Sequence, residues 1–261
     1  MDSPPLGNLA IWLNADRLGL LDAAGVASWP NLGSLGGAFA QAVASMQPIL
    51  KRAVVKGKAA VHFHGGQLLT ASVPMLETFT RTTPWTAAIV MRLMPAVPAS
   101  ARPNVPLTTF PHSPFSGPGV LPFYFAPPTT TIAIVAGNYA ADAIQLAWPA
   151  PPIGAWFCWV TGYDGSGAAA GLTARMNGLP QAVQATTGSL AGSPASGQPT
   201  TLGAVADLSN NVGVLGDLAE LLIWTPALDT LTLEMAEGYL LQRYLSAPLV
   251  RQYASPRRPW C

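Results

Sequence analysis

Prolines and glycines interrupt this chain so often that helices of ordinary length fit almost nowhere. The 261 residues include 26 prolines and 25 glycines, and proline stands at about twice its usual share of roughly 5%. Proline removes a backbone donor and breaks helices, and both residue types mark turns. This spacing predicts many short strands joined by turns, which is typical of an all-β sandwich.

Eight segments between these turns have the composition of β-strands, and several are rich in β-branched or aromatic residues. Asn177-Gly178 follows one of them and predicts a tight hairpin, because both turn positions tolerate positive φ. The expected strands are Ala10–Asn14, Ala59–His64, Thr86–Arg92, Thr130–Ala136, Ile144–Trp148, Ala155–Tyr163, Gly171–Met176 and Leu218–Trp224.

One amphipathic helix is predicted near the end of the chain, over about residues 230–245. Asp229 is a suitable N-cap for it. A stripe of residues recurs there at helical spacing: Leu233, Ala236, Leu240 and Tyr244. Gly238 weakens the helix by about 1 kcal/mol relative to alanine, so packing has to support it.

The expected domain organisation is simple, with one domain over residues 1–250 and a tail over 251–261. Ten prolines fall between Met94 and Pro128. Such a run favours extended, polyproline-like arms and disfavours central strands. We therefore expect residues 94–128 to form an insertion. It either packs on the surface of its own domain or extends as an arm that docks onto a neighbouring subunit.

Charged residues make up only 10% of the chain, against roughly 25% in typical soluble domains, and the net charge is +1. This balance argues against a nucleic-acid partner, which requires a strongly basic surface. A charge-poor surface is also typical of one that neighbouring subunits partly cover. We interpret the one basic cluster as solvated loop charges: Lys51, Arg52, Lys56 and Lys58.

Neither a signal peptide nor a membrane span is recognisable in the sequence. The first residues lack a basic region and a hydrophobic core, and no apolar stretch reaches the roughly 18 residues of a span. Cys158 lies in an apolar run and is expected to be a buried thiol. Cys261 ends the tail, where it could pair between chains. We expect cytoplasmic synthesis and no membrane partner.

The two ends of the chain carry five short motifs in a characteristic order. They are Trp12-Leu13-Asn14-Ala15-Asp16, Trp29-Pro30-Asn31-Leu32-Gly33, Phe63-His64-Gly65, Gly216-Asp217-Leu218-Ala219-Glu220 and Glu237-Gly238-Tyr239-Leu240. Over about residues 8–246, this order resembles the concanavalin A-like lectin/glucanase superfamily, specifically the laminin-G-like modules of bacterial and phage proteins. The resemblance implies an all-β, two-sheet antiparallel jelly-roll sandwich with one C-terminal helix.

Two acidic positions of the family pattern are replaced in this chain. The turn at Trp29–Gly33 lacks its aspartate, and the usual Phe-Asp-Gly reads Phe63-His64-Gly65. If these acids bind calcium in relatives, the replacements leave a calcium site here without support. The sequence therefore predicts no cofactor.

Catalytic residues are not predicted. Glycoside hydrolysis needs two carboxyl groups roughly 5–9.5 Å apart, and no two of the twelve acids stand at i, i+2. Asp217 and Glu220 are three apart, which predicts opposite faces of a strand. Glu234 and Glu237 are expected on a solvated helix face. No nucleophile elbow and no phosphate-binding glycine loop is found. We expect a protein that is not an enzyme.

His62 and His64 share one face of a predicted strand, on either side of Phe63. Two histidines at this spacing can ligate a metal. They can equally be two surface residues at a sheet edge, and no neighbouring acid or cysteine supplies a third ligand. The sequence therefore predicts no metal site.

Sugar binding by such sandwiches uses loop aromatics that stack on the ring and amide or carboxylate groups that bind its hydroxyls. Three loop pairs have this composition, although each residue could equally serve the core or a turn. They give the candidate carbohydrate-binding residues Asn138, Tyr139, Tyr163, Asp164, Asn210 and Asn211.

Two functions fit these observations. The first is a structural protein of a phage virion, which decorates the capsid or tail or attaches to the host; its partners would be other virion proteins or copies of itself. This function rests on the proline-rich segment, the charge-poor surface and the resemblance. The alternative is a carbohydrate-binding lectin module of a bacterial surface protein, which binds cell-surface glycans.

Overall fold

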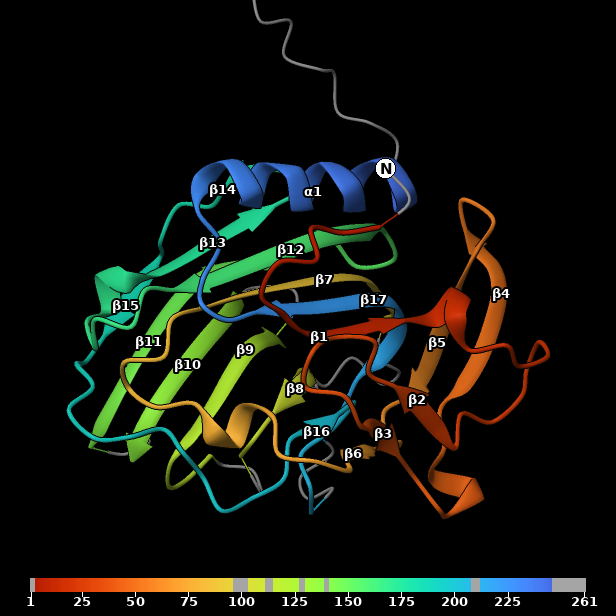
Figure 1. Ribbon diagram of the computed structural model, residues 1–261, viewed down its shortest axis with the longest axis horizontal. Coiled ribbons are helices and arrows are strands. Elements are labelled where there is room, and N and C mark those ends of the chain that lie inside the picture. Colours follow the sequence, from red (N-terminus) through yellow and green to blue (C-terminus); the bar gives the residue numbers. More distant parts are fainter. Residues whose placement is uncertain are drawn as a thin grey trace, which may run out of the picture.

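The computed structural model describes residues 3–95, 103–110, 115–126, 130–138, 141–207 and 212–245. Two antiparallel sheets pack face to face, and one α-helix follows them near the end of the chain (Figure 1). The predicted jelly-roll sandwich with a C-terminal helix is confirmed.

The first sheet has eight strands in the described residues. Its order is β14-β13-β12-β7-β17-β5-β4, and β1 pairs with β17 beside this path. The bounds in that order are Leu179–Pro180, Leu172–Met176, Trp156–Tyr163, Trp85–Leu93, Leu215–Trp224, Lys58–His64, Ile49–Val55 and, for β1, Leu9–Asn14.

The second sheet has nine strands in the described residues, in the order β15-β11-β10-β9-β8-β16-β6-β3-β2. Their bounds in that order are Ala185–Thr187, Asp142–Pro149, Thr130–Asn138, Gly119–Ala126, Asn104–Thr108, Thr201–Leu202, Leu69–Ala71, Ala38–Ala40 and Ser28–Pro30. Short 3₁₀ turns at Ala15–Arg17, Ala44–Met46, Leu76–Thr78 and Ala169–Gly171 lie between strands.

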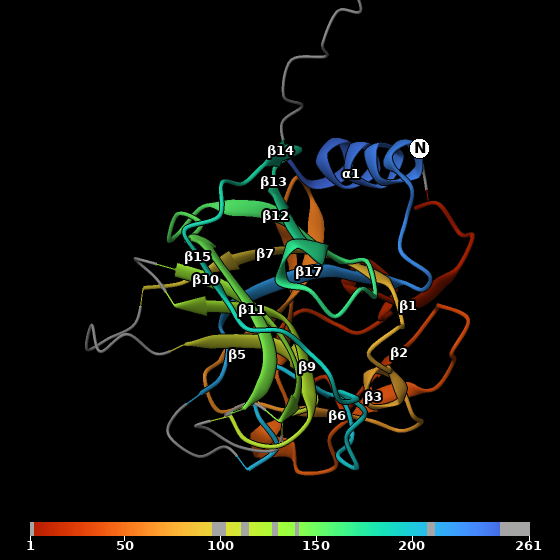
Figure 2. The same ribbon diagram turned by 90° about the vertical axis from the view of Figure 1, so that its left-hand side faces the viewer.

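Helix α1, Thr230–Tyr244, lies on the outer face of the eight-stranded sheet (Figure 2). The carboxylate of Asp229 accepts a hydrogen bond of 2.9 Å from the Thr232 amide, which confirms the predicted N-cap. The buried side of α1 packs on outward residues of the sheet such as Val90 and Leu222. In the part of the chain that the structure describes, no helix is long and apolar enough to cross a membrane.

Strand alternation divides the apolar residues between two cores. Inward residues such as Trp85, Trp159 and Ile223 fill the space between the sheets, and outward residues such as Cys158 and Trp224 pack under α1. All eight strands expected from the sequence are present as β1, β5, β7, β10, β11, β12, β13 and β17. The hairpin after β13 also forms as predicted, with φ of 51° at Asn177 and 82° at Gly178.

The prediction that prolines keep residues 94–128 out of the central sheet is wrong for the described part. Strands β8 and β9 lie inside the nine-stranded sheet, between β16 and β10. The register of β8 against β9 shifts around Pro106, and that of β9 against β10 shifts around Pro122. The ladder therefore bulges where proline has no amide to donate, and bulges are where sheets accept proline.

The motifs from the two ends of the chain meet at Glu220. This buried carboxylate accepts hydrogen bonds from Trp12 Nε1 at 2.6 Å, from Asn14 Nδ2 at 3.1 Å and from the Tyr239 hydroxyl at 2.9 Å. Asn31 joins the second motif to the same region, because its side chain bonds the backbone of Trp12 and Ala10. The five motifs thus include residues that fasten β1, β17 and α1 together.

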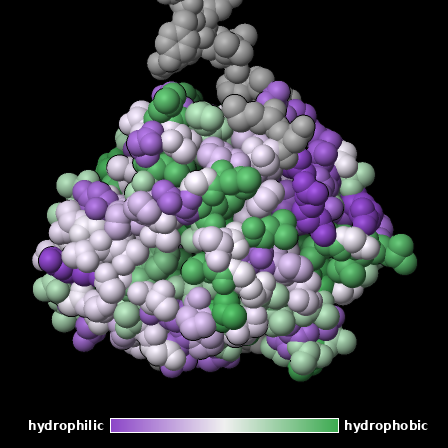
Figure 3. Space-filling model, in the orientation of Figure 1, coloured by the Kyte–Doolittle hydropathy of each residue, from purple (hydrophilic) through white to green (hydrophobic). Residues whose placement is uncertain are grey.

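Hydrophobic and hydrophilic residues are unevenly distributed over the face that Figure 3 shows. In Figure 3, hydrophobic residues form several separate patches, and the most hydrophilic residues gather on the right-hand side, toward β4 and β5. Members of the basic cluster there are engaged with the backbone. Lys56 Nζ donates to the carbonyls of Gln242 and Leu245 at the end of α1, and Arg52 Nε donates to Leu20.

Candidate functional site

A pocket of about 220 Å³ opens on the outer face of the eight-stranded sheet, beside the beginning of α1. Its floor comes from outward positions of three neighbouring strands, Thr86 on β7, Gly162 on β12 and Thr173 on β13. Their neighbours Trp85, Tyr163 and Leu172 point into the core, as strand alternation requires. The pocket thus lies on a part of this face that α1 leaves uncovered.

The walls of the pocket are partly aliphatic. They come from the segment before α1, from α1 itself and from the short turn after β12, and they include Ala170, Ala227, Leu228 and Leu233. The Thr86 hydroxyl accepts a hydrogen bond of 3.0 Å from the Leu228 amide, which fixes this wall to the floor.

Four polar side chains line the pocket: Thr86, Asp164, Thr173 and Arg175. Arg175 is held rigidly, because its Nε lies 2.9 and 2.8 Å from the two carboxylate oxygens of Glu237 and its Nη2 donates to the Gly178 carbonyl at 2.6 Å. Burial raises the pKa of the Glu237 carboxyl, and its pairing with Arg175 opposes this rise. The positive charge of Arg175 is therefore largely compensated from within the protein.

Glycines keep the pocket open. A Cβ at Gly162 would lie 3.0 Å from the Thr173 hydroxyl, so any side chain there would enter the pocket. A Cβ at Gly171 would lie 2.0 Å from a carboxylate oxygen of Asp164, so the absence of a side chain lets this carboxylate lie against the backbone. Asp164 Oδ1 also accepts from the Ser166 amide at 2.8 Å.

Hydroxyl, carboxylate and guanidinium groups beside aliphatic walls suit a small ligand rich in hydroxyl groups. The carboxylate can accept from two neighbouring hydroxyls, and threonine and arginine can donate. The pocket offers an aliphatic surface in place of an aromatic platform.

Of the predicted sugar-binding residues that the structure describes, Tyr163 and Asp164 belong to the pocket lining. Asp164 is exposed at its edge. Tyr163 is 1% exposed, packs on Trp85 and donates its hydroxyl to the Arg81 carbonyl, so its ring cannot stack on a sugar. Asn138 lies exposed at the end of β10, in the other sheet. Tyr139, Asn210 and Asn211 lie outside the described residues.

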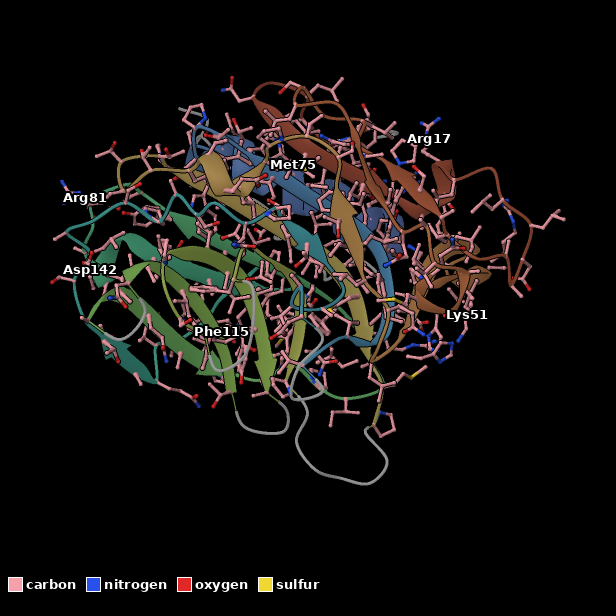
Figure 4. All side chains as sticks on the ribbon, turned by 90° about the horizontal axis from the view of Figure 1, so that it is seen from below. Arg17, Lys51, Met75, Arg81, Phe115 and Asp142 are labelled. Carbon is pink, nitrogen blue, oxygen red and sulfur yellow. The ribbon has the colours of Figure 1, made fainter. Side chains whose placement is uncertain are left out.

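A second polar cluster lies at the far end of the same outer face, around the fully buried Asp217. Its Oδ1 lies 2.6 Å from His62 Nδ1, and its Oδ2 accepts from Arg92 at 2.5 and 3.0 Å. Lys51 Nζ lies 3.9 Å away. Figure 4 places Lys51 and Arg81 at opposite ends of the molecule, so this cluster is remote from the pocket.

The expectation that Asp217 and Glu220 face opposite ways is wrong. The register of β17 against β7 shifts between Leu218 and Glu220, and this bulge puts one extra residue between the two acids. Both carboxylates therefore lie on the outer face, where one meets Arg92 and the other Tyr239. Each is 0% exposed and enclosed by structural partners.

Glu237 also differs from the prediction of a solvated helix face. It is 3% exposed because Arg175 on β13 draws it toward the sheet, whereas Glu234 is exposed as expected.

The two histidines do share a face, with ring centroids 4.2 Å apart. His62 is buried and bonded to Asp217, and His64 is exposed. Burial lowers the pKa of His64, and the neighbouring His62 and Lys51 lower it further. Among the described residues, no group of three or more histidine, cysteine, aspartate or glutamate side chains is arranged to hold a metal ion.

The fold is a two-sheet antiparallel β-sandwich, and α1 covers the outer face of its eight-stranded sheet only in part. No family model matches the chain, and no curated protein matches it. Among solved structures, it is similar to the binding domain of botulinum neurotoxin serotype D, with 7% identity and a TM-score of 0.56 over 90% of this chain and 52% of that one.

Two further structures have the same general fold. The binding domain of Paraclostridial Mosquitocidal Protein 1 is 10% identical, with a TM-score of 0.56 over 90% of this chain and 53% of that one. A Trypanosoma rangeli sialidase in complex with sialic acid is 11% identical, with a TM-score of 0.51 over 94% of this chain and 35% of that one. The chain thus spans between a third and about half of their length, and the likeness is one of fold.

Sequence reasoning missed most of the pocket. Thr86, Thr173 and Arg175 stand at the outward positions of predicted strands, so their direction could have been inferred from the alternation with Trp85 and Leu172. No sequence signal indicates which outward positions α1 leaves uncovered, because that depends on the packing of α1 on the sheet.

Proposed function

We propose that this chain is a carbohydrate-binding domain of the concanavalin A-like class and that it does not catalyse a reaction. The observation that carries the proposal is the pocket of about 220 Å³ beside α1, with its Asp164, Thr173 and Arg175 side chains next to aliphatic walls. Sugars present hydroxyls and apolar ring faces together, and this lining offers partners for both.

We propose the absence of catalysis because of where the acidic side chains lie and what surrounds them. Asp217 and Glu220 are closed off by His62, Arg92 and Tyr239. In the pocket, Asp164 is the one lining carboxylate among the described residues, whereas most glycoside hydrolases use a pair of carboxyl groups.

We favour this function over a virion structural role. The virion interpretation relied on the proline-rich segment as a docking arm, and β8 and β9 instead lie within the sheet. Location in a virion and partnership with other virion proteins stay predictions from the sequence.

A glycan array followed by calorimetry tests the proposal. We expect binding of a defined set of glycans at micromolar to millimolar concentration, unchanged by EDTA. Gly162→Val should abolish binding because its side chain fills the pocket, while the fold is retained since valine favours strands.

Gly66→Val is the matched control, since a Cβ at Gly66 meets nothing within 4 Å and lies outside the pocket. Absence of binding to any glycan, or equal binding by Gly162→Val, would refute the proposal.

A further inference from the structure

The charges around the pocket point to one class of sugar. We propose that the pocket selects neutral terminal sugars and rejects those that carry a carboxylate, an inference that rests on the proposed carbohydrate binding. The juxtaposition that carries it is that of two residues lining the same pocket: Asp164, whose carboxylate is exposed, and Arg175, which an internal carboxylate neutralises.

Arg175 is the pocket's one lining cation among the described residues, and it does not offer a free charge. Its Nε lies within 2.9 Å of both carboxylate oxygens of Glu237 in a bifurcated hydrogen bond, and Glu237 is 3% exposed. An acidic sugar would have to compete with a partner that is already in place. The guanidinium can still donate to neutral hydroxyls, for which its net charge is not needed.

Asp164 adds repulsion. Its carboxylate is exposed at the pocket edge and is fixed there by the Ser166 amide at 2.8 Å and by the bare backbone of Gly171. A sugar carboxylate bound in the same pocket would meet a like charge at short range. A neutral sugar instead finds an acceptor for one or two hydroxyls.

The beginning of α1 does not reverse this balance. A helix N-terminus attracts anions, but Asp229 already occupies this one by accepting from the Thr232 amide and hydroxyl, both at 2.9 Å. Glu234, in the first two turns of α1, adds a further exposed negative charge on this helix. The α1 residue that lines the pocket is the aliphatic Leu233, and the charges of Asp229 and Glu234 near it are both negative.

Matched pairs of glycans that differ only at C6 test the inference: glucosides against glucuronides and galactosides against galacturonides. We expect the wild-type protein to bind the neutral member of the preferred pair at least about fivefold more tightly at low salt. Asp164→Asn should narrow this ratio, because it removes the like charge and keeps an acceptor. Glu237→Gln should narrow it independently, because it frees the charge of Arg175.

Glu234→Gln is the control for Glu237→Gln, since it removes a charge from an exposed position on the same helix and leaves the Arg175 pair intact. Circular dichroism checks that each variant is folded, and the exposed Asp164→Asn keeps the test valid if Glu237→Gln unfolds. Binding of neither member of any pair would overturn this inference, whereas only the absence of binding to every glycan on the array would also overturn the carbohydrate proposal. Equal or tighter binding of the acidic member would overturn the inference alone.

Discussion

At the scale of single residues, the buried acids decide how stability depends on pH. Asp217 is fully buried and holds His62, Arg92 and Lys51 around it, and it is reached by strands β5, β7 and β4 as well as β17. Burial alone would raise the pKa of Asp217, but the hydrogen bonds from His62 and Arg92 outweigh it and hold this pKa below its ordinary value.

We expect Asp217→Asn to lower the free energy of unfolding by about 3 kcal/mol at pH 7, since it leaves Arg92 and His62 facing a neutral group. The folded-state pKa is lowered, so the stabilisation is present above the unfolded value near 3.9 and is lost as pH falls through the folded value. Urea unfolding between pH 2.5 and 7 measures this. Glu234→Gln is the control at an exposed position. If the difference in free energy of unfolding between the wild type and Asp217→Asn stays constant over that pH range, the account is contradicted.

Glu220 behaves in the opposite sense. Burial raises its pKa, although hydrogen bonds from Tyr244, Trp12 and Tyr239 oppose the rise. The folded state therefore keeps this proton to higher pH than the unfolded state, whose pKa is about 4.3. Stability contributed by Glu220 should fall as pH rises from about 4.3 to the folded value. The free energy of unfolding of the wild type and of Glu220→Gln should be measured over pH 4–8. We expect the decrease with rising pH to be lost in the variant, whereas parallel curves for the two proteins would show that the pKa of Glu220 is not raised.

At the scale of elements, replacing either of two glycines by alanine should change the free energy of unfolding in opposite directions. Gly238 lies inside α1, where a Cβ would meet nothing within 4 Å, so Gly238→Ala should raise the free energy of unfolding by about 0.5–1 kcal/mol. Gly178 has a φ of 82° in the β13–β14 hairpin, so Gly178→Ala should lower it by about 1 kcal/mol. Chemical unfolding of both variants checks the pair; a change of the same sign in both would contradict this account of the backbone.

The elements also show how far the sequence predicts the fold. Long strands such as β7 and β12 were predictable because each alternates or runs apolar over eight or nine residues. Strands of two or three residues, such as β16, carry too little pattern. β8 and β9 were missed because a bulge at proline depends on the partner strand, which the sequence alone does not display.

At the scale of the whole molecule, five sequence motifs predicted the sandwich. Their residues proved to be mainly structural, and Glu220 links the motifs from both ends of the chain. The candidate pocket was found from the geometry of the structure instead. Asp164 was predicted, whereas Arg175 acquires its role only from Glu237, which is 62 residues away and on another element. Contacts of that kind arise from the packing of α1 on the sheet, and the spacing of residues along the sequence does not predict them.

A variant that lacks residues 94–128 should not fold. The deletion removes β8 and β9 and separates β10 from β16, so we expect loss of cooperative unfolding as measured by near-ultraviolet circular dichroism. A folded, monodisperse deletion variant would contradict the central place of these strands.

The most direct test of the central claim is an amide-resolved NMR titration of the 27.1 kDa protein with the neutral glycan that binds most tightly. The account predicts saturable shifts confined to amides around the pocket, at Gly162, Asp164, Gly171 and Thr173. Gly162→Val should remove them. Saturable shifts at the remote Asp217 cluster, with the pocket amides unchanged, would contradict the account.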